Sequence, residues 1–192
     1  MSRSARVLAP SDLRVLLARM RFGRLANRNT VLILLSFRTG LRACEMAGLT
    51  WEMLTRPDGK FSDTVEIADH IAKNGRARRI PVHPELRSAL VSLRQTEGQR
   101  SGPVIRSQRG GHMTPRAIVN WFSATYQELG FDGCSSHSGR RTFITQAARL
   151  VSKAGGSLRD VQELAGHRAL TTTERYIEGD REAQRRLVRL LC

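Results

Sequence analysis

Two arginines lie in short motifs that could hold a phosphate group. Arg42 follows Thr39-Gly40-Leu41 at an expected helix start, where a cation opposes the helix dipole and a bound phosphate would compensate it. A surface arginine paired with Glu45 is the simpler explanation of that motif taken alone. Arg140 follows His137 by three residues, so on a helix a proton-transferring group would lie beside a second cation. A capping histidine with a surface arginine is the alternative for this pair.

Two further segments carry a possible nucleophile and a possible proton donor. Tyr176, one of two tyrosines in the chain, comes nine residues after His167. Lys73 precedes Asn74-Gly75, a pair typical of tight hairpin turns, so its ammonium could project from a hairpin tip into a groove. Taken singly, each has a plainer interpretation, a packing tyrosine with its hydroxyl at the surface and a solvated lysine.

The charge of the chain favours a polyanionic partner. Its 192 residues include 32 Lys and Arg against 17 Asp and Glu, a net charge of +15. Such an excess indicates nucleic acid more often than a merely basic protein or one bound to acidic membrane. The arginines are spread along the chain, which predicts a folded basic surface rather than a basic tail. Only 5% of residues are aromatic, so phosphate contacts should dominate over base stacking.

Cysteine usage and hydropathy point to an intracellular protein. Cys44, Cys134 and Cys192 form an odd set without C-x-x-C spacing, so neither a disulfide framework nor a zinc site is expected. The N-terminus carries no apolar stretch of the signal-peptide kind, and the longest apolar run, Val31 to Leu35, is too short to span a bilayer. We therefore expect a cytoplasmic protein with no membrane partner.

The periodicity of apolar residues predicts an α+β, mainly α fold with a small antiparallel β-sheet. Turn residues do not mark a domain boundary, so one domain is expected over residues 1–192, with an N-terminal extension at 1–10 and a C-terminal tail at 180–192. The expected elements are a helix capped by Ser11, helices through Val31–Phe37 and from Leu41, strands on either side of Asn74-Gly75, and helices beginning near Pro84, Thr114-Pro115, Gly139, Ser157 and Thr171.

No cluster is decisive alone, but their order and neighbours resemble the catalytic domain of the tyrosine recombinases, also called the phage-integrase family. That family shows T-G-L-R-x-x-E, a hairpin lysine before an R-x-x-P-like stretch, H-x-x-R, G-H, then T-T and a tyrosine nine residues after that His. The resemblance covers roughly Ala9 to Ile177. The residues that match its six catalytic positions are Arg42, Lys73, His137, Arg140, His167 and Tyr176.

The sequence also departs from the family pattern. The usual H-x-L-R-H is replaced by His137-Ser138-Gly139-Arg140-Arg141, and residues 151–156 look like an insertion. Family members usually carry an N-terminal clamp domain, the core-binding domain, which we expect to be absent here, either by nature or because the chain is a fragment. In the family, tails like residues 180–192 dock on a neighbouring subunit; folding back on its own domain is the alternative.

The resemblance implies a chemistry and a set of partners. Arg42, Arg140 and His167 would bind the scissile phosphate of double-stranded DNA, and Tyr176 would attack it to form a 3′-phosphotyrosine. His137 would accept the phenolic proton and Lys73 would protonate the departing 5′-hydroxyl. No cofactor and no metal are expected, because side chains supply the cations. Recombination between two duplexes would need a homotetramer on DNA, formed from a monomer or weak oligomer.

Three other interpretations compete with this one. A metal-dependent nuclease would need clustered Asp and Glu, whereas the acids here are scattered. A helical DNA-binding regulator without catalysis explains the charge but not Tyr176 with its five partners. A DNA strand transferase resembling type IB topoisomerases shares the same chemistry. The sequence does not separate integration, excision, inversion and resolution.

Overall fold

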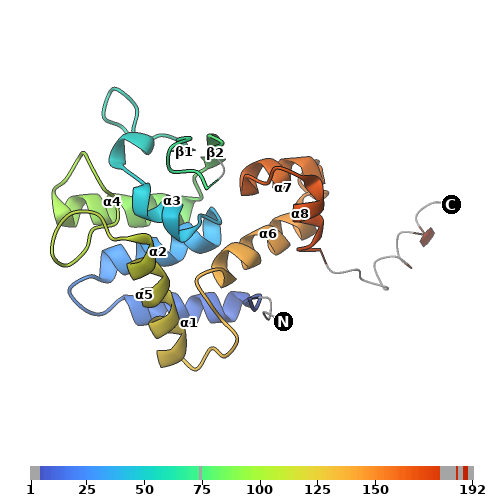
Figure 1. Ribbon diagram of the computed structural model, residues 1–192, viewed down its shortest axis with the longest axis horizontal. Helices are drawn as coiled ribbons and strands as arrows, with labels where there is room; N and C mark the ends of the chain where they lie inside the picture. Colours follow the sequence, from blue (N-terminus) through green and yellow to red (C-terminus); the bar gives the residue numbers. More distant parts are fainter. Residues whose placement is uncertain (1–4, 74, 178–184, 186–187, 190–192) are drawn as a thin grey trace.

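The structure is a computed structural model that describes residues 5–73, 75–177, 185 and 188–189. Most of the described chain is helical, and the one small sheet lies at the edge of the molecule, at the top of Figure 1; the predicted mainly helical α+β fold is confirmed. In chain order the elements are α1 (Pro10–Met20), α2 (Ala26–Arg38), α3 (Ala43–Gly48), the 3-10 turn η1 (Trp51–Met53), β1 (Thr64–Ile67), β2 (Arg78–Pro81), α4 (Pro84–Glu97), α5 (Pro115–Glu128), α6 (Ser138–Leu150), α7 (Leu158–Ala165) and α8 (Leu170–Glu174).

Helix α2 forms the centre of the core. All its residues from Val31 to Phe37 are buried, and the helix contacts α1, α4 and α6. A helix enclosed on several sides must be apolar around its circumference, which explains why the longest apolar run of the sequence lies here. Among the described residues, no helix is long and apolar enough to cross a membrane.

The two strands pair antiparallel, but the predicted tight hairpin is wrong. Val65 lies opposite Ile80 in the register, and residues 68–77 connect the strands, a loop far longer than the two residues Asn74-Gly75. Ala72 donates to the Ala68 carbonyl at 3.1 Å, so the chain turns helically instead of extending the ladder. Ile71 packs against Gly48 of α3, and this contact draws the loop away from a simple hairpin.

The predicted starts of two helices agree with the structure. Thr114 caps α5, with its hydroxyl accepting from the Ala117 amide at 3.2 Å, and Pro115 takes the first helical position. Ser157 caps α7, where Asp160 accepts from the Ser157 amide at 2.7 Å. Both follow from side chains that satisfy amides left unpaired in the first turn.

Two other predicted starts are wrong by one or two residues. Helix α1 begins at Pro10 with Ala9 as its N-cap, rather than after Ser11, because Asp12 accepts from the Ala9 amide at 2.9 Å. Helix α8 begins at Leu170 after an extended Ala169, so Thr171 lies inside it. In both cases the residue that caps the helix lies two positions before the residue predicted to cap it.

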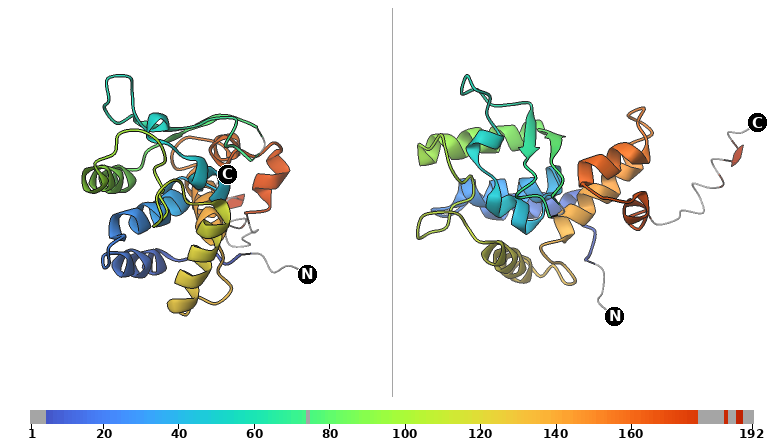
Figure 2. Two further views of the ribbon diagram at one scale, coloured as in Figure 1. Left: turned by 60° about the vertical axis from the view of Figure 1, so that its left-hand side comes forward. Right: turned by 45° about the horizontal axis from the view of Figure 1, so that its top comes forward.

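Helices α6 and α7, together with the turn after α8, build a second, smaller apolar cluster at one side of the molecule (Figure 2). Its buried members are Ile144, Val161 and Ala165, with Tyr176 packed against them. Tyr176 thus belongs to a small satellite core that joins the main body chiefly through α6 and β2. The tail at residues 180–192 lies almost entirely outside the described residues.

Candidate active site

The side chain of Arg140, near the start of α6, connects this helix to two other segments by hydrogen bonds. Its side chain is 3% exposed, and its two terminal nitrogens donate to the Gly40 carbonyl and the Ala165 carbonyl, each at 2.7 Å. Gly40 has φ +64°, and a Cβ there would meet the ring of Phe143, so only glycine suits this turn. The guanidinium therefore joins the loop before Arg42 to the C-terminal end of α7, and burial lowers its pKa.

His167 lies directly beside this arginine. Its Nε2 is 2.9 Å from an Arg140 terminal nitrogen, and its Nδ1 is 2.9 Å from the Thr173 hydroxyl. A guanidinium can only donate, so Nε2 accepts and the ring proton resides on Nδ1, facing Thr173. Burial, together with the positive charge of nearby arginines, lowers the His167 pKa to about 4, and the ring is neutral near pH 7.

Arg42 is held by a buried carboxylate that it shares with Arg78. Arg42 is the N-cap of α3, and its backbone amide and guanidinium donate to the two oxygens of Glu45 at 2.9 and 3.1 Å. Arg78 donates to the same two oxygens at 2.9 Å each. Burial opposes ionisation of Glu45, but hydrogen bonds and charge from both arginines outweigh it and lower the pKa of the carboxyl.

Tyr176 lies just past α8 with its ring against His167. The two rings stack with centroids 5.5 Å apart, and the Arg141 guanidinium lies 5.8 Å from the tyrosine ring centroid. The Tyr176 carbonyl accepts from the Thr145 hydroxyl at 3.2 Å, which fastens this turn to α6. The phenol is half-buried, and no hydrogen bond to its hydroxyl occurs among the described residues.

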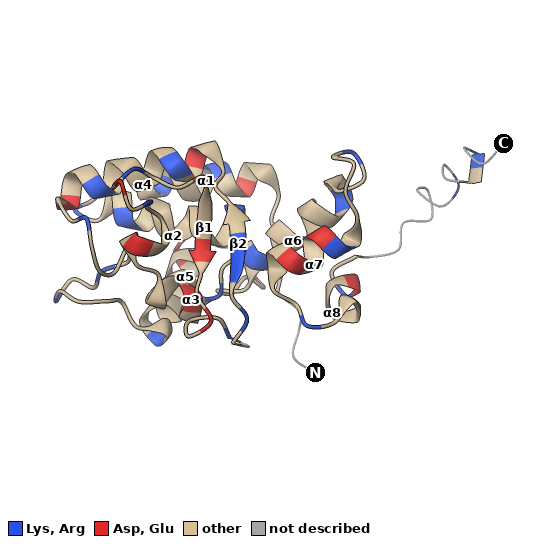
Figure 3. Ribbon diagram, turned by 90° about the horizontal axis from the view of Figure 1, so that it is seen from above, with Lys and Arg blue, Asp and Glu red and all other residues tan. Residues whose placement is uncertain are grey.

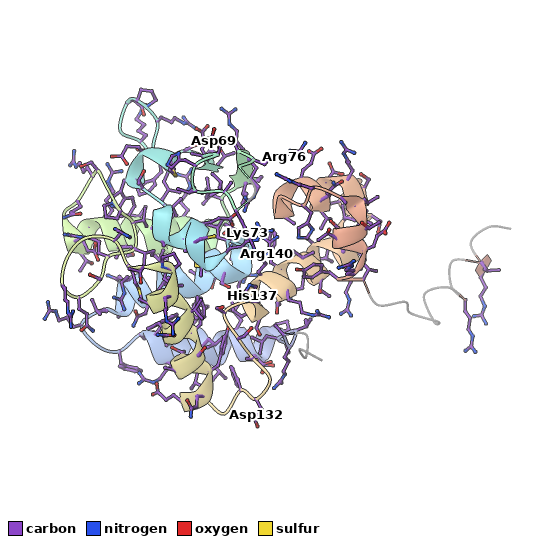
Figure 4. The ribbon with its side chains drawn as sticks, in the orientation of Figure 1. Asp69, Lys73, Arg76, Asp132, His137 and Arg140 are labelled. Atoms are coloured by element: carbon purple, nitrogen blue, oxygen red, sulfur yellow. The ribbon has the colours of Figure 1, made fainter. Side chains whose placement is uncertain are left out.

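His137 and Lys73 complete the set from the solvent side. Both side chains are exposed, one at the N-cap of α6 and the other on the loop between the strands (Figure 4). Burial of part of the ring and the positive charges of Lys73, Arg140 and Arg42 lower the His137 pKa. The six residues singled out in the sequence therefore surround one region, although no direct contact joins Lys73 to the others.

Two residues of this network were not singled out in the sequence. Arg78 was visible only as one member of a basic stretch, although it opens the R-x-x-P pattern ending at Pro81. Thr173, which holds the Nδ1 side of His167, was visible only as part of a threonine run. Within the described ranges, no group of three His, Cys, Asp or Glu is placed to hold a metal ion. Basic residues are distributed over most elements, as Figure 3 shows.

The fold matches solved structures of tyrosine recombinases. The Tn1549 transposon integrase in complex with transposon right end DNA superposes with a TM-score of 0.77 at 17% identity, over 99% of this chain and 67% of that one. The XerA recombinase gives a TM-score of 0.74 at 18% identity, over 96% of this chain and 64% of that one. The fold is thus that of a tyrosine recombinase catalytic domain.

The chain belongs to the phage integrase family, whose sequence model matches residues 6–182. It is 33% identical over 160 residues to the tyrosine recombinase XerC of Pseudomonas aeruginosa, covering 81% of this chain and 49% of that protein. It is 31% identical over 160 residues to XerC of Pseudomonas putida, covering 81% and 50%. The chain spans about half the length of the curated relatives it matches. The resemblance predicted from the six motifs is confirmed.

Proposed function

We propose that this chain is a site-specific recombinase that cleaves and rejoins double-stranded DNA in the cytoplasm, with Tyr176 as its nucleophile. The observation that carries the proposal is the position of His167, which contacts Arg140 at 2.9 Å on one side and stacks on the Tyr176 ring on the other. A phenol is thereby placed beside a group of cations suited to a phosphate. Family membership and the DNA-bound relatives support the same chemistry.

The two arginines bind the non-bridging oxygens of the scissile phosphate, where negative charge grows in the transition state. Arg42 has 14% of its side chain exposed, and only one of its guanidinium nitrogens donates to Glu45. Arg140 uses three of its five N–H groups on Gly40, Ala165 and His167, and two remain without a partner among the described residues. Neither arginine has to reorganise far to meet the phosphate.

Proton transfers accompany the attack. The Tyr176 oxygen bonds to phosphorus as the bond to the 5′-oxygen breaks, which leaves a 3′-phosphotyrosine and a 5′-hydroxyl. His137, whose lowered pKa keeps it neutral, accepts the phenolic proton, and Lys73 donates one to the departing oxygen. Attack by another 5′-hydroxyl reverses these steps, so the phosphodiester bond is restored without ATP.

His167 has to change partners before it can donate to the phosphate. Its Nε2 now accepts from Arg140, so the donation requires this one hydrogen bond to break and Nε2 to gain a proton, while the two carbonyl contacts of Arg140 remain. A phosphate next to the ring raises the His167 pKa by charge attraction, which favours this proton uptake. Binding of the substrate therefore drives the rearrangement that the contact needs.

A covalent trapping experiment tests the proposal. A pool of nicked duplexes, in which the cleaved end diffuses away, should give a denaturant-stable protein–DNA adduct that Tyr176→Phe abolishes while retaining DNA binding. Tyr126→Phe is the matched control, because Tyr126 is 1% exposed in the core and burial raises its pKa. An adduct that survives Tyr176→Phe, or one lost with Tyr126→Phe, contradicts the assignment. Relaxation of supercoils without strand exchange would instead indicate a topoisomerase-like activity.

The active assembly is proposed to be a homotetramer on DNA, formed from protein that is monomeric when free. Two duplexes cut at two sites each require four nucleophiles, and alignment by DNA makes the cyclic assembly favourable. Residues 180–192 are proposed to connect neighbouring subunits. A truncation after Gly179 should keep the fold and lose cooperative filling of paired half-sites in gel-shift titrations; equal cooperativity would show that the tail is not the connector.

A further inference from the structure

Arg78 donates a hydrogen bond from each of its three guanidinium nitrogens, yet the proposed mechanism gives it no contact with the phosphate. Its side chain is 8% exposed and forms a fork with both oxygens of Glu45 at 2.9 Å. Glu45 itself is fully buried. A buried carboxylate without a cation is strongly unfavourable, so an ionised Glu45 needs a positive group next to it.

Glu45 has two candidate cations, and they are not equally close. Arg78 reaches both carboxylate oxygens, whereas the Arg42 guanidinium reaches only Oε1, at 3.1 Å. The three side chains together carry a formal charge of +1. While Arg78 satisfies the carboxylate, that remaining positive charge belongs to Arg42 and can act on a phosphate.

Arg78 also fastens the segment that carries the other phosphate-binding group. Its Nε donates to the Leu164 carbonyl at 3.2 Å, near the end of α7 and three residues before His167. A Cβ on Gly166 would lie 3.1 Å from the Arg78 Cδ and Nη1, so this glycine makes room for the guanidinium. Arg78 thus contacts Glu45, the partner of Arg42, and it also holds the end of α7, which precedes His167.

We propose that Arg78 is a positioning residue that neutralises Glu45 and so leaves the charge of Arg42 available for the phosphate. This inference rests on the proposed function. Without Arg78, Arg42 becomes the only cation of the buried carboxylate, and the pair becomes neutral. The phosphate then loses the field of one arginine, although Arg42 itself is still present.

The test measures single-turnover cleavage of nicked DNA at saturating protein, with thermal unfolding followed in parallel. Arg78→Met should cleave about 100-fold more slowly, as expected for loss of one charged contact in the transition state. The double variant Arg78→Met/Glu45→Gln should recover at least about tenfold of that loss, because a neutral amide no longer competes for Arg42. Arg79→Met is the matched control: Arg79 is adjacent on β2 but exposed and paired with exposed Glu66, and its cleavage rate should not change.

Rescue by the second substitution separates this role from simple destabilisation, since a second core change would otherwise add to the damage. If Arg78→Met does not fold, the comparison of Glu45→Gln with the double variant still decides, because their rates should differ by no more than about tenfold, the part of the loss left to the Leu164 contact. A double variant slower than both single variants, or wild-type cleavage by folded Arg78→Met, overturns the inference. Absence of any adduct with the unaltered chain would instead refute the proposed function.

Discussion

Replacing Gly139 by alanine should loosen the contact on which the start of α6 depends. An alanine Cβ there would overlap the Ser36 hydroxyl of α2 and lie 2.8 Å from the Phe37 Cδ2. Gly139 replaces the leucine of the H-x-L-R-H pattern, and without a side chain it leaves room for Ser36 and Phe37 of α2. His137 and Arg140 flank the glycine, and any shift of the helix start moves both.

The expected loss follows from two opposed effects. Forcing a methyl group into a packed contact costs about 1–3 kcal/mol, whereas alanine is better than glycine in a helix by at most about 1 kcal/mol. The net destabilisation should be about 1–2 kcal/mol, which lowers the melting temperature by roughly 3–6 °C for a chain of this size. Displacement of Arg140 by even about 1 Å should slow cleavage by about tenfold to hundredfold.

Chemical denaturation and single-turnover cleavage of four proteins check this reasoning: the unaltered chain, Gly139→Ala, Ser36→Gly and the double variant. Ser36→Gly removes both the hydroxyl and the Cβ that block the methyl group. The double variant should therefore be at least about 1 kcal/mol more stable than the sum of the single effects. Phe37 is unchanged in all four proteins, so additive losses would refute the assignment of the destabilisation to the Ser36 contact.

Three further outcomes are expected. Because the His167 pKa is about 4 in the folded chain against an ordinary 6.5, stability should be full above pH 6.5 and fall by on the order of 2 kcal/mol toward pH 4, and denaturation of His167→Gln should show a flatter profile. Cleavage should persist in excess EDTA, and activity restored only by magnesium would favour a nuclease. Arg42→Lys and Arg140→Lys should each lose about hundredfold in single-turnover rate, since an ammonium cannot form the guanidinium fork, and near-normal rates would argue against phosphate contacts.

Short sequence patterns predicted those features of the fold that depend on residues close together in the chain. The caps of α5 and α7 follow from a side chain and an amide three residues away, so Thr114 and Ser157 could be recognised directly. The helix predicted through Val31–Phe37 also rests on residues close together in the sequence, and it is confirmed as part of α2. The loop between the strands was mispredicted because Ile71 packs on Gly48, a contact between residues distant in sequence that no local pattern contains.

The sequence predicted which residues lie near one another at the candidate site, but it did not predict the contacts between them. Spacing alone left Arg42, His137 and Tyr176 with ordinary alternatives, and only the order of the motifs, read as a family resemblance, joined them. Arg42 does pair with Glu45, as the simpler explanation held, but this pair is one part of a network that includes Arg78. Arg78 lies 33 residues from Glu45 in the sequence. Only the packing of β2 on α7 determines that Arg78, and not another of the nearby arginines, pairs with Glu45.

The burial of Arg140 bears on how such a site can be both stable and reactive. Arg140, which we propose to bind the phosphate, is 3% exposed and donates to two backbone carbonyls, one before Arg42 and one at the end of α7. These carbonyls fix the guanidinium without cancelling its charge, since they are dipoles and not anions. The positive field is therefore present before substrate arrives, and little reorganisation is needed when charge develops on the phosphate. The same bonds tie the segment bearing His167 and Tyr176 to the main core. The position of the proposed nucleophile and the position of the charge therefore depend on one side chain.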